Sequence, residues 1–343
     1  MCGEGAGEMN ADQMTEGARR IRDICWGYWR SQILFVAMRL GVFDLLSRRE
    51  LPVQEVARIL SLSERGTGIL LSALAGLGLL VKKDERFGMT DAVLELLTSD
   101  SPQSMCGAVH HCENLKRCWE ELEKCVRTGE ACSVQAKTPE ALAHRRADFM
   151  AAMKSNAVVV AEEIYEKAGI ASCHRLLDIG CGPATFAIEF VRRNPGLTGT
   201  LVDVEEVASI SSKKISDAGC ARRLETVGGD FRKVDFGAGR YGLAFLSHVV
   251  HMYNAASNEQ LLGRIHRALE PSGRVVIHDY VLNENDGHST EAAVFAVNML
   301  VGTCGGNCYS EREVFRWLTQ AGFVEPKSVP LRWGTQLVIG TKR

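Results

Sequence analysis

From residue 172 onward, short apolar runs alternate with amphipathic segments, and this alternation limits the possible folds more than any other feature. The runs typical of strands are HRLLDIG, LTGTLVDV, RLETVGGD, YGLAFLS, GRVVIHDYVL and TQLVIGTK. Segments with helical periodicity separate them, such as ATFAIEFVRRN, SNEQLLGRIHRALE and REVFRWLTQAGF. Repeated strand–helix units predict a doubly wound α/β sheet with a mostly parallel core. Ligands bind such sheets at the carboxyl ends of the strands.

Side chains that can bind or react lie at or just past the ends of these predicted strands. They are Asp178, Asp203, Asp230, Ser247, His251 and Asp279. The carboxyl ends of parallel strands meet at one edge of a sheet, so we expect these six side chains to line one site.

The stretch LLDIGCGPATF places Gly180 and Gly182 directly after the first predicted strand. Glycine lets a backbone turn sharply and approach a ligand closely. The pattern is similar to the GxGxxG loop that binds NAD, which is a weak signal by itself. Three details disfavour NAD: Thr185 replaces the third glycine, Pro183 lies inside the loop, and Asp178 precedes it. A carboxylate at that position repels a pyrophosphate and suits a ligand with an ammonium group.

The next two strand ends suggest the rest of the ligand. Asp203 is placed to hold a ribose diol. Asp230 is placed to accept from an adenine amino group, with Phe231 on the face of the ring. Each aspartate alone is equally typical of a turn. Their order at three successive strand ends favours S-adenosylmethionine, which has an amine, a ribose and an adenine.

The N-terminal third predicts a separate domain. LPVQEVARILSLSERGTGILLSALAGLGLLVKKDERFGMTD is typical of two helices and a strand pair, the winged-helix pattern. Its second helix has a single arginine, whereas binding to DNA phosphates requires several cations, so packing against protein is favoured over DNA. We expect a winged-helix domain at 14–100, a helical connector at 101–168 and the ligand-binding domain at 169–343.

Helical periodicity over residues 148–167 puts Met150 and Met153 close to one face. This pattern is typical of a core helix, and it also fits an apolar wall for a substrate, because methionine adapts to irregular surfaces. Both interpretations stay open at this point.

Composition excludes several functional classes. The chain has 40 Lys and Arg against 42 Asp and Glu, a net charge of −2, which argues against a dedicated nucleic-acid binder. No apolar run approaches the ~18 residues of a membrane span, and the N-terminus lacks a signal-peptide profile, so we expect a soluble cytoplasmic protein. The 12 cysteines include no CxxC. Buried thiols are favoured over a soft-metal site at Cys106, Cys112, Cys118, Cys125 and Cys132, and no metal is predicted.

Taken together, these motifs resemble the class I S-adenosylmethionine-dependent methyltransferases. More narrowly, they resemble the small-molecule O-methyltransferases related to caffeate and acetylserotonin O-methyltransferases. LGVFDLL, LLSALAGLGLL and MTD are similar to that family's dimerisation domain, and LLDIGCGPATFAIEF and VGGDF to its cofactor motifs. SHVVHMY and NMLVGTCGGNCYSEREVFRWLTQAGF are similar to its catalytic and C-terminal segments. The resemblance implies a Rossmann-like sheet of seven strands, a winged-helix dimerisation domain and a homodimer.

The resemblance also implies roles for individual residues. His251 matches the general base, and Asp279 matches an acidic residue that orients it. Gly180, Gly182, Asp203, Asp230, Phe231 and Ser247 match cofactor-binding positions. Met150, Met153, Met299 and Thr303 match the lining of a substrate pocket, which Trp26 and Trp29 of a partner subunit would complete.

The sequence departs from the family pattern at two places. Met252 and Tyr253 follow His251 where Asp-Trp is common, and Cys308 occupies the place of a second acidic residue. These departures imply a less tightly held His251 or an unusual substrate. Neighbouring His248 could line the cofactor or substrate channel, but a structural role is favoured for it. His278 is expected to be structural, on the opposite face from Asp279.

The function predicted from these features is transfer of a methyl group from S-adenosylmethionine to a hydroxyl of a small, aromatic metabolite. A histidine can take the proton of a phenol as attack proceeds. Other interpretations stay open: N-, S- or C-methylation, a relative that transfers no methyl group, a winged-helix regulator that senses a ligand, and an NAD-dependent oxidoreductase.

Overall fold

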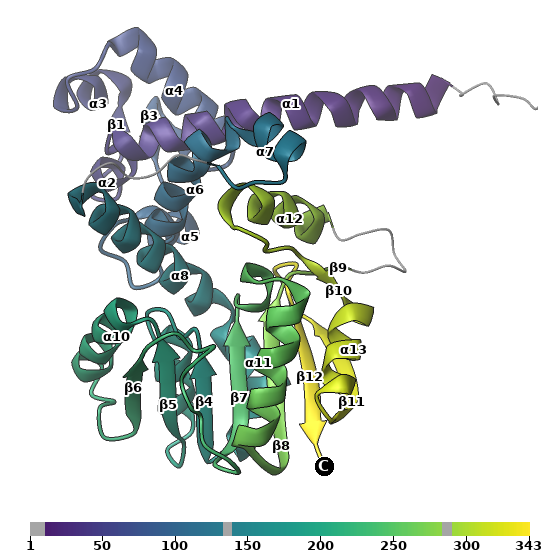
Figure 1. Cartoon of the computed structure of the whole chain (residues 1–343). Helices are drawn as coiled ribbons and strands as arrows, with labels where there is room; N and C mark the ends of the chain where they lie inside the picture. Colours follow the sequence, from purple (N-terminus) through teal and green to yellow (C-terminus); the bar gives the residue numbers. More distant parts are fainter. Residues whose placement is uncertain (1–10, 133–138, 283–289) are drawn as a thin grey trace, which may run out of the picture. The chain divides into compact units, whose positions relative to one another are not determined.

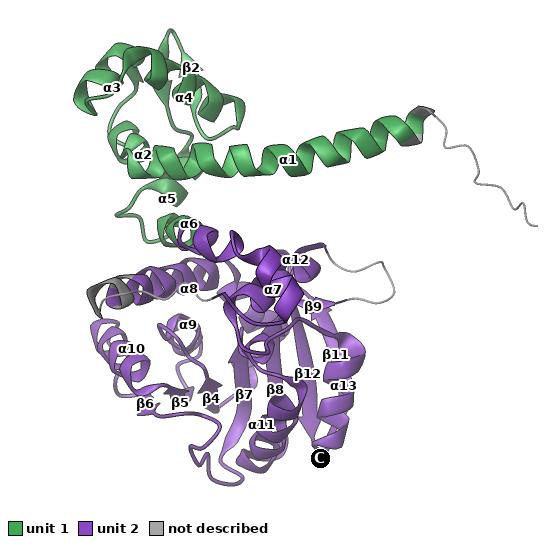
Figure 2. Cartoon of the chain, turned by 45° about the horizontal axis from the view of Figure 1, so that its top comes forward, with its two compact units in different colours: residues 1–110 green, residues 111–343 purple. Residues whose placement is uncertain are grey.

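The computed structural model describes residues 11–132, 139–282 and 290–343. The chain divides into two compact units, residues 1–110 and residues 111–343, coloured separately in Figure 2. No helix within the described ranges has the length and apolar character needed to span a membrane. The separate helical connector at 101–168 remains a prediction.

The first unit has the predicted helix–turn–helix followed by a strand pair. Ser63 caps the second helix, since its hydroxyl accepts the Gly66 N–H at 3.2 Å. The two strands turn through Asp84 and Glu85, whose φ angles are 45° and 63°. The elements are α1 Ala11–Arg39, α2 Val42–Leu46, β1 Leu51–Pro52, α3 Val53–Ile59, α4 Glu64–Gly76, β2 Val81–Lys83, β3 Arg86–Gly88 and α5 Asp91–Leu97, with α6 Cys106–Trp119 crossing into the second unit.

One apolar core holds this unit together. Phe43 of α2, Leu71 and Leu74 of α4 and Phe87 of β3 are buried in it. The three short strands form a sheet in the order β1-β3-β2. The winged-helix prediction is therefore confirmed.

The second unit contains the predicted strand–helix alternation. Its helices are α7 Leu122–Thr128, α8 Pro139–Lys167, α9 Thr185–Arg193, α10 Glu205–Asp217, α11 Ala255–Ala268, α12 Thr290–Gly302 and α13 Glu311–Gln320, with 3-10 turns η1 Ile170–Ser172 and η2 Val250–Met252. Its strands are β4 Arg175–Ile179, β5 Thr198–Asp203, β6 Leu224–Gly228, β7 Tyr241–Ser247, β8 Leu269–Asp279, β9 Val281–Leu282, β10 Tyr309–Ser310, β11 Phe323–Pro330 and β12 Gln336–Lys342.

Seven of these strands form one sheet in the order β11-β12-β8-β7-β4-β5-β6. The five strands from β8 to β6 run parallel, and β12 runs antiparallel to both of its neighbours, β8 and β11. The predicted doubly wound seven-stranded sheet is thus confirmed. β4 and β7 are neighbours near its centre, so the segments that follow them meet at one edge.

The strand β11 has no clear signal in the sequence. Its segment FVEPKSVP contains Pro326 and Pro330 and is interrupted by an irregularity between Val324 and Lys327. Proline is tolerated on an edge strand, where its missing N–H breaks no ladder bond. β11 pairs with β12 alone at the edge of the sheet, which explains how it forms from so weak a pattern.

Helices cover both faces of the sheet. In Figure 1, α11 crosses in front of the sheet, and its buried side chains share a core with those of α13 and one sheet face. On the other face, side chains of α8, α9 and α10 form a second core with Leu176, Phe245 and Val276. Asp279 and the loops after β4 and β7 lie at the carboxyl ends of the strands.

Candidate active site

The glycine loop after β4 takes a left-handed path that few residues can follow. Gly180 and Gly182 have φ angles of 71° and 51°. A Cβ at Gly180 would lie 2.6 Å from Cγ2 of Val249, which follows β7, so only glycine fits there. The backbone therefore forms a close cradle, as expected for a loop that holds a ligand.

Asp203 fixes this loop from the end of β5. One of its carboxylate oxygens accepts the Gly182 N–H at 2.9 Å, and the other accepts the Val204 N–H at 2.8 Å. Burial raises the pKa of Asp203, and these two hydrogen bonds oppose that shift. The predicted ribose-binding carboxylate thus also shapes the cradle.

Asp178, the last residue but one of β4, is a buried carboxylate with no donor. Its exposed fraction is 2%, and no hydrogen bond reaches it from the described residues. Burial, together with the negative charge of Asp203, raises its pKa to about 8. Burying a carboxylate without a partner is costly, so the site favours a ligand with a positive group here.

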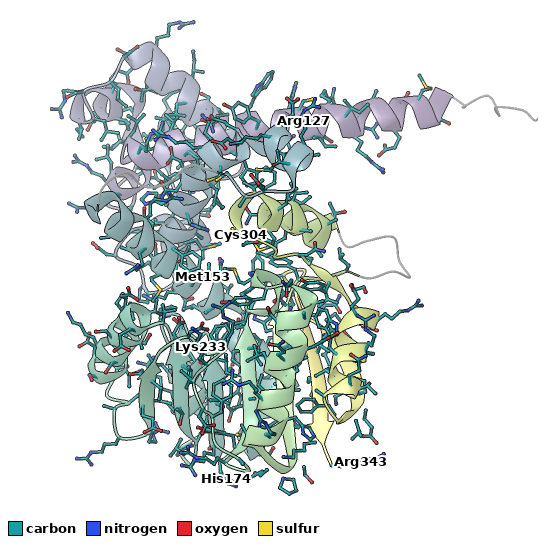
Figure 3. All side chains as sticks on the ribbon, viewed as in Figure 1. Arg127, Met153, His174, Lys233, Cys304 and Arg343 are labelled. Carbon is teal, nitrogen blue, oxygen red and sulfur yellow. The ribbon has the colours of Figure 1, made fainter. Side chains whose placement is uncertain are left out.

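A pocket joins this loop to the end of β7 and to one face of α8. Met153, labelled in Figure 3, lines it from α8. The structure thus brings four predicted cofactor residues and one predicted substrate residue into contact with the same space. The lining residues are Met153, Asn156, Ala157, Asp178, Gly180, Cys181, Gly182, Pro183, Thr185, Phe186, Ser247, His248 and His278.

Asp230 and Phe231 lie after β6 and outside that pocket. The Asp230 carboxylate holds Arg232 through two hydrogen bonds of 2.9 Å, and this hydrogen bonding lowers the pKa of Asp230. The Phe231 ring is buried with its centroid 5.5 Å from that of Tyr253, edge to face. The carboxylate also accepts the Arg232 main-chain N–H at 3.0 Å, and since a carboxylate has about four acceptor sites, Asp230 can still receive an amino group.

His251 and Asp279 form the predicted pair. His251 Nδ1 lies 2.6 Å from Asp279 Oδ1, and the exposed fractions of the two residues are 5% and 3%. Burial alone would raise the pKa of Asp279, but His251, His248 and the Tyr280 N–H together lower it. The ionised carboxylate accepts, so Nδ1 carries the proton and Nε2 holds the lone pair.

His248 and His278 lie beside this pair. His248 has a left-handed φ of 57°, and burial lowers its pKa to about 4, so its ring is neutral at pH 7. His278 hydrogen-bonds to Ser247 Oγ at 2.8 Å and to Thr335 Oγ1 at 3.0 Å. Both hydrogen bonds fit the expected structural role of His278. The first of them also fixes the Ser247 side chain.

The opposite-face expectation for His278 is confirmed. Its ring meets that of Phe186 edge to face, on the side of the sheet where Val276 is buried, whereas Ile277 is buried on the other side. His278 also borders the pocket beside the glycine loop, and its ring centroid lies 4.7 Å from that of His248. The left-handed backbone of His248 turns its ring back over the end of β8, which alternation within one strand does not reveal.

Cys308, at the place of the second acidic residue, is buried beside the pair. Burial and the charge of Asp279 raise the pKa of its thiol to about 12. A neutral thiol cannot replace a carboxylate. Within the described residues, Asp279 is therefore the single group hydrogen-bonded to the His251 ring.

Two aromatic residues near His251 were missed by the sequence analysis. The Phe295 ring meets the His251 ring edge to face, with centroids 4.9 Å apart, and Tyr280 stacks on Phe295 at 4.3 Å. Phe295 comes from α12, far along the chain from His251. Its position in an apolar helix gives no signal that separates it from a core residue.

The other predicted substrate residues are spread along two helices. Met150 of α8 and Met299 of α12 are buried, with exposed fractions of 5% and 6%. The Thr303 hydroxyl is already engaged, because it donates to the Met299 carbonyl at 2.7 Å and accepts the Gly306 N–H at 2.9 Å. Their contact with a substrate remains a prediction.

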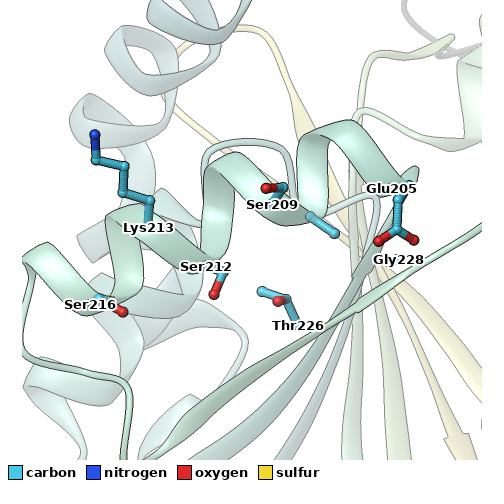
Figure 4. A pocket seen from close by; sticks show the side chains of 8 residues that line it. Glu205, Ser209, Ser212, Lys213, Ser216, Thr226 and Gly228 are labelled. Carbon is cyan, nitrogen blue, oxygen red and sulfur yellow. The ribbon is translucent and has the colours of Figure 1, made fainter.

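A larger hollow, about 470 Å³, lies between α10 and β6 (Figure 4). Ser209, Ser212 and Lys213 line it from α10, and Thr226 lines it from the edge strand. It contains none of the predicted cofactor or catalytic residues, so its size alone does not identify it as the site of chemistry.

Of the cysteines in the described ranges, Cys181 lines the pocket at the glycine loop and Cys308 lies beside the His251–Asp279 pair. No disulfide joins those in the described ranges, and Cys118, Cys125 and Cys132 pack with Val301 near α12. Among the described residues, His248, His251 and Asp279 are the one group of three with metal-ligating atoms within 4.8 Å of one another. The 2.6 Å contact inside this group is the length of a hydrogen bond between a base and its partner.

The doubly wound sheet, the glycine loop and its three aspartates define an S-adenosylmethionine-binding methyltransferase. The residues fit that cofactor, since the unpartnered Asp178 carboxylate suits its ammonium group and the loop leaves no space for a side chain at Gly180. A family model described as the O-methyltransferase domain matches residues 128–324, and one described as the O-methyltransferase dimerisation domain matches residues 23–99. The chain belongs to this O-methyltransferase family, which uses S-adenosylmethionine.

Similar proteins of known name agree with this assignment. The chain is 28% identical to 3-hydroxy-5-methyl-1-naphthoate 3-O-methyltransferase of Streptomyces sahachiroi, over 90% of each chain. It is 26% identical to L-tyrosine C(3)-methyltransferase of Streptomyces lavendulae, over 88% of this chain and 85% of that one. Human N-acetylserotonin methyltransferase, solved in complex with S-adenosylmethionine, superposes with a TM-score of 0.84 at 26% identity, over 99% of both chains.

Proposed function

We propose that this methyltransferase acts on a hydroxyl of a small aromatic metabolite, with His251 as the general base. The observation that carries the proposal is the 2.6 Å contact between His251 Nδ1 and the Asp279 carboxylate. It leaves Nε2 of His251 as the basic nitrogen, and no described residue hydrogen-bonds to it. The named relative from Streptomyces sahachiroi, an O-methyltransferase of a hydroxylated naphthoate, supports an aromatic hydroxyl as acceptor.

The chemistry divides between the cofactor and the chain. When bound, S-adenosylmethionine supplies an electrophilic methyl group. Asp178, Gly180, Gly182, Asp203, Asp230, Phe231 and Ser247 are the residues that we assign to holding it. His251 Nε2 takes the proton of the acceptor hydroxyl, and Asp279 stabilises the imidazolium that results. The near-complete burial of both residues excludes water from the proton transfer.

Met150, Met153 and Met299 are the residues that we assign to the acceptor pocket. The hydroxyl of Thr303, the fourth residue predicted there, is already engaged by Met299 and Gly306. Met153 supports the assignment most directly, because it borders the pocket that the glycine loop and His248 also line. Phe295 and Tyr280 add a flat aromatic surface beside the base. Such a surface favours a planar acceptor through ring stacking.

The test of this function has two parts. Incubating a metabolite extract with the enzyme and methyl-deuterated cofactor, followed by mass spectrometry, identifies the acceptor by its gain in mass. A His251→Ala variant is then assayed on that acceptor. We expect kcat to fall by roughly 10²–10⁴-fold while cofactor binding persists. Full activity of the variant would contradict the role of His251.

Methylation at carbon is the second candidate. Two observations favour methylation at carbon as a second candidate. They are the similarity to an L-tyrosine C(3)-methyltransferase and the neutral Cys308 thiol beside Asp279. A base that deprotonates a phenol also raises the nucleophilicity of the ring carbon next to it, so the same pair serves both reactions. Nuclear magnetic resonance of the product with an isotope-labelled methyl group separates a methoxy group from a methyl group on carbon.

We also propose that the enzyme is a homodimer, with residues 14–100 as the dimerisation domain and 169–343 as the cofactor-binding domain. The match to the dimerisation model supports this, together with an exposed apolar set on α1. Trp26 and Trp29 stack with centroids 5.6 Å apart and are 44% and 58% exposed. Exposed stacked tryptophans are typical of a surface that is covered by a partner.

A further inference from the structure

The turn that carries His251 is held through its main-chain carbonyls. Asn258, from α11, donates its side-chain amide to the Val250 carbonyl at 2.9 Å and to the Tyr253 carbonyl at 3.2 Å. The Tyr309 hydroxyl donates to the same Tyr253 carbonyl at 2.6 Å. Asn258 is 1% exposed, so these bonds form away from water. The carbonyls on either side of the base are therefore fixed by two other segments.

The carbonyl of His251 itself is held by the loop after α12. The Asn307 N–H donates to it at 2.9 Å. A Cβ at Gly306 would lie 2.3 Å from the His251 carbonyl oxygen and 3.2 Å from the Met252 carbonyl carbon. The main chains thus pack against each other without room for a side chain. This close approach explains the glycine at 306 in the segment GGN.

Thr303 ties this loop to α12. Its hydroxyl donates to the Met299 carbonyl at 2.7 Å and accepts the Gly306 N–H at 2.9 Å. α12 also places the Phe295 ring 4.9 Å from the His251 ring. The helix therefore reaches the base in two ways, through a side chain and through the main chain of the following loop.

We infer that Thr303, Gly306 and Asn307 form a positioning loop that fixes the main chain of His251 and joins it to α12. This inference rests on the proposed role of His251 as the base. In it, Thr303 acts through the loop and not through contact with the acceptor. Asp279 fixes the ring of His251, and the positioning loop fixes the backbone from which that ring projects.

The loop matters for rate because both constraints are needed to aim Nε2. With the carbonyl bond lost, the turn can shift while the Nδ1 contact to Asp279 persists. A displacement of about 1 Å at a reacting group costs roughly 10²-fold in rate. The hydrogen bond that fixes the cofactor cradle comes from Asp203 and does not involve this loop, so the loss should appear in kcat and not in the KM for S-adenosylmethionine.

The experiment compares matched variants of the full-length enzyme. Asn307→Pro removes the N–H that reaches the His251 carbonyl, whereas Asn307→Ala keeps it. Thr303→Val removes the hydroxyl that links α12 to Gly306, whereas Thr303→Ser keeps it. Gly306→Ala introduces the clash with the His251 carbonyl. We expect kcat to fall by roughly 10²-fold in Asn307→Pro, Thr303→Val and Gly306→Ala, and far less in the two matched variants.

A second readout follows His251 directly. Ring signals of isotope-labelled histidine, assigned with His251→Ala, are recorded for each variant by nuclear magnetic resonance. We expect the His251 signal to shift in Asn307→Pro and Thr303→Val and to return to the native position in Thr303→Ser. If Asn307→Pro does not fold, the kcat and the His251 ring signal of Thr303→Val are compared with those of Thr303→Ser, and this comparison tests the positioning loop.

The outcomes separate this inference from the proposed function. Unchanged kcat and an unchanged His251 signal in Thr303→Val and Gly306→Ala would overturn the positioning loop, even with His251→Ala inactive. A raised KM for the acceptor with native kcat in Thr303→Val would also overturn it, since that is the result of lost acceptor contact. Full activity of His251→Ala, with shifted ring signals in Asn307→Pro, would instead contradict the role of His251 as the base. The structural role of the positioning loop would still stand.

Discussion

Asp178 and Asp203 lie at the ends of two adjacent parallel strands, and the charge of Asp203 adds to burial in raising the pKa of Asp178 to about 8. Two carboxylates at such a site disfavour each other's ionised form until a cation arrives. The ammonium group of S-adenosylmethionine is the cation that we propose binds here. This relationship favours a ligand with an ammonium group at the glycine loop and disfavours a pyrophosphate.

The affinity for S-adenosylmethionine should therefore depend on pH. In the free site Asp178 binds a proton below pH 8, and binding of an ammonium group favours its ionised form, so binding releases a proton. We expect affinity to rise by up to about tenfold per pH unit as pH approaches 8, and then to level off. Titration calorimetry in buffers of different ionisation enthalpy measures both the affinity and the released proton.

The matched variants for that prediction are Asp178→Asn and Asp217→Asn. Asp217 is exposed at the end of α10, away from the pocket. Asp178→Asn should lose the pH dependence and bind more weakly at pH 8, and Asp217→Asn should behave like the native chain. An affinity that stays constant as the pH approaches 8 in the native chain would contradict the cation site.

Substituting the two loop glycines should give unequal effects. A Cβ at Gly180 meets Val249 at 2.6 Å, whereas one at Gly182 meets nothing within 4 Å. Both positions have positive φ, so alanine is strained at each. We expect Gly180→Ala to destabilise the protein by about 1–3 kcal/mol more than Gly182→Ala. Urea unfolding of the two variants measures the difference, and equal losses would show that Val249 moves aside.

Asp279→Asn should reduce the rate without weakening cofactor binding. An amide lacks the charge that stabilises the protonated imidazole, and it can present an N–H that reverses the tautomer of His251. We expect kcat to fall by roughly 10²–10³-fold on the acceptor. Single-turnover kinetics with saturating cofactor measure the chemical step. Asp217→Asn again provides the control. A native rate in Asp279→Asn would contradict the proposal that Asp279 orients His251.

The start of α13 should contribute measurable stability. Ser310 and Glu313 form a capping box, in which the Ser310 N–H and hydroxyl both reach Glu313 Oε2 at 2.8 Å. Ser310→Ala should lower the free energy of unfolding by about 1 kcal/mol. Ser209→Ala, an exposed serine within α10, is the control and should change it little. The prediction fails if the two serine variants unfold at the same urea concentration.

Removal of the exposed tryptophans of α1 should weaken self-association. Trp26→Ala with Trp29→Ala deletes the stacked pair, and we expect the double variant to dissociate at protein concentrations where the native chain is dimeric. Sedimentation velocity over a dilution series reports the change. Trp333→Ala, which removes a tryptophan 57% exposed in the second unit, should leave the oligomeric state unaltered. Equal behaviour of the two variants would place the interface elsewhere.

Most of the sheet could be predicted from the sequence because its strands are buried on both faces. β4, β5, β7 and the second half of β8 are short, largely apolar runs, which is the pattern of central parallel strands. β11 could not be predicted from the sequence because its prolines and polar residues are typical of a loop. Only pairing with β12 makes it a strand. Edge strands depend on a neighbour more than on their own residues.

The candidate site divides in the same way. Asp178, Asp203, His251 and Asp279 could be found because each follows a recognisable strand at a defined place. Phe295, Asn258 and Asn307 could not, because their contacts with the His251 turn join segments that lie 44, 7 and 56 residues away in the chain. The close packing of the main chain at Gly306 against His251 is marked in the sequence only by a glycine pair. The sequence does not show which segment packs against that pair.

The sequence by itself determined the fold class, the cofactor and the order of the site residues, because these follow from local hydrophobic periodicity and from chemistry at strand ends. Tertiary structure alone decided the pKa of Asp178 near 8, the left-handed turn of His248 over β8 and the hydrogen bond from the Asn307 N–H to the His251 carbonyl. Burial, electrostatic coupling and close packing arise between segments distant in sequence. No local pattern records the distance at which two such segments meet.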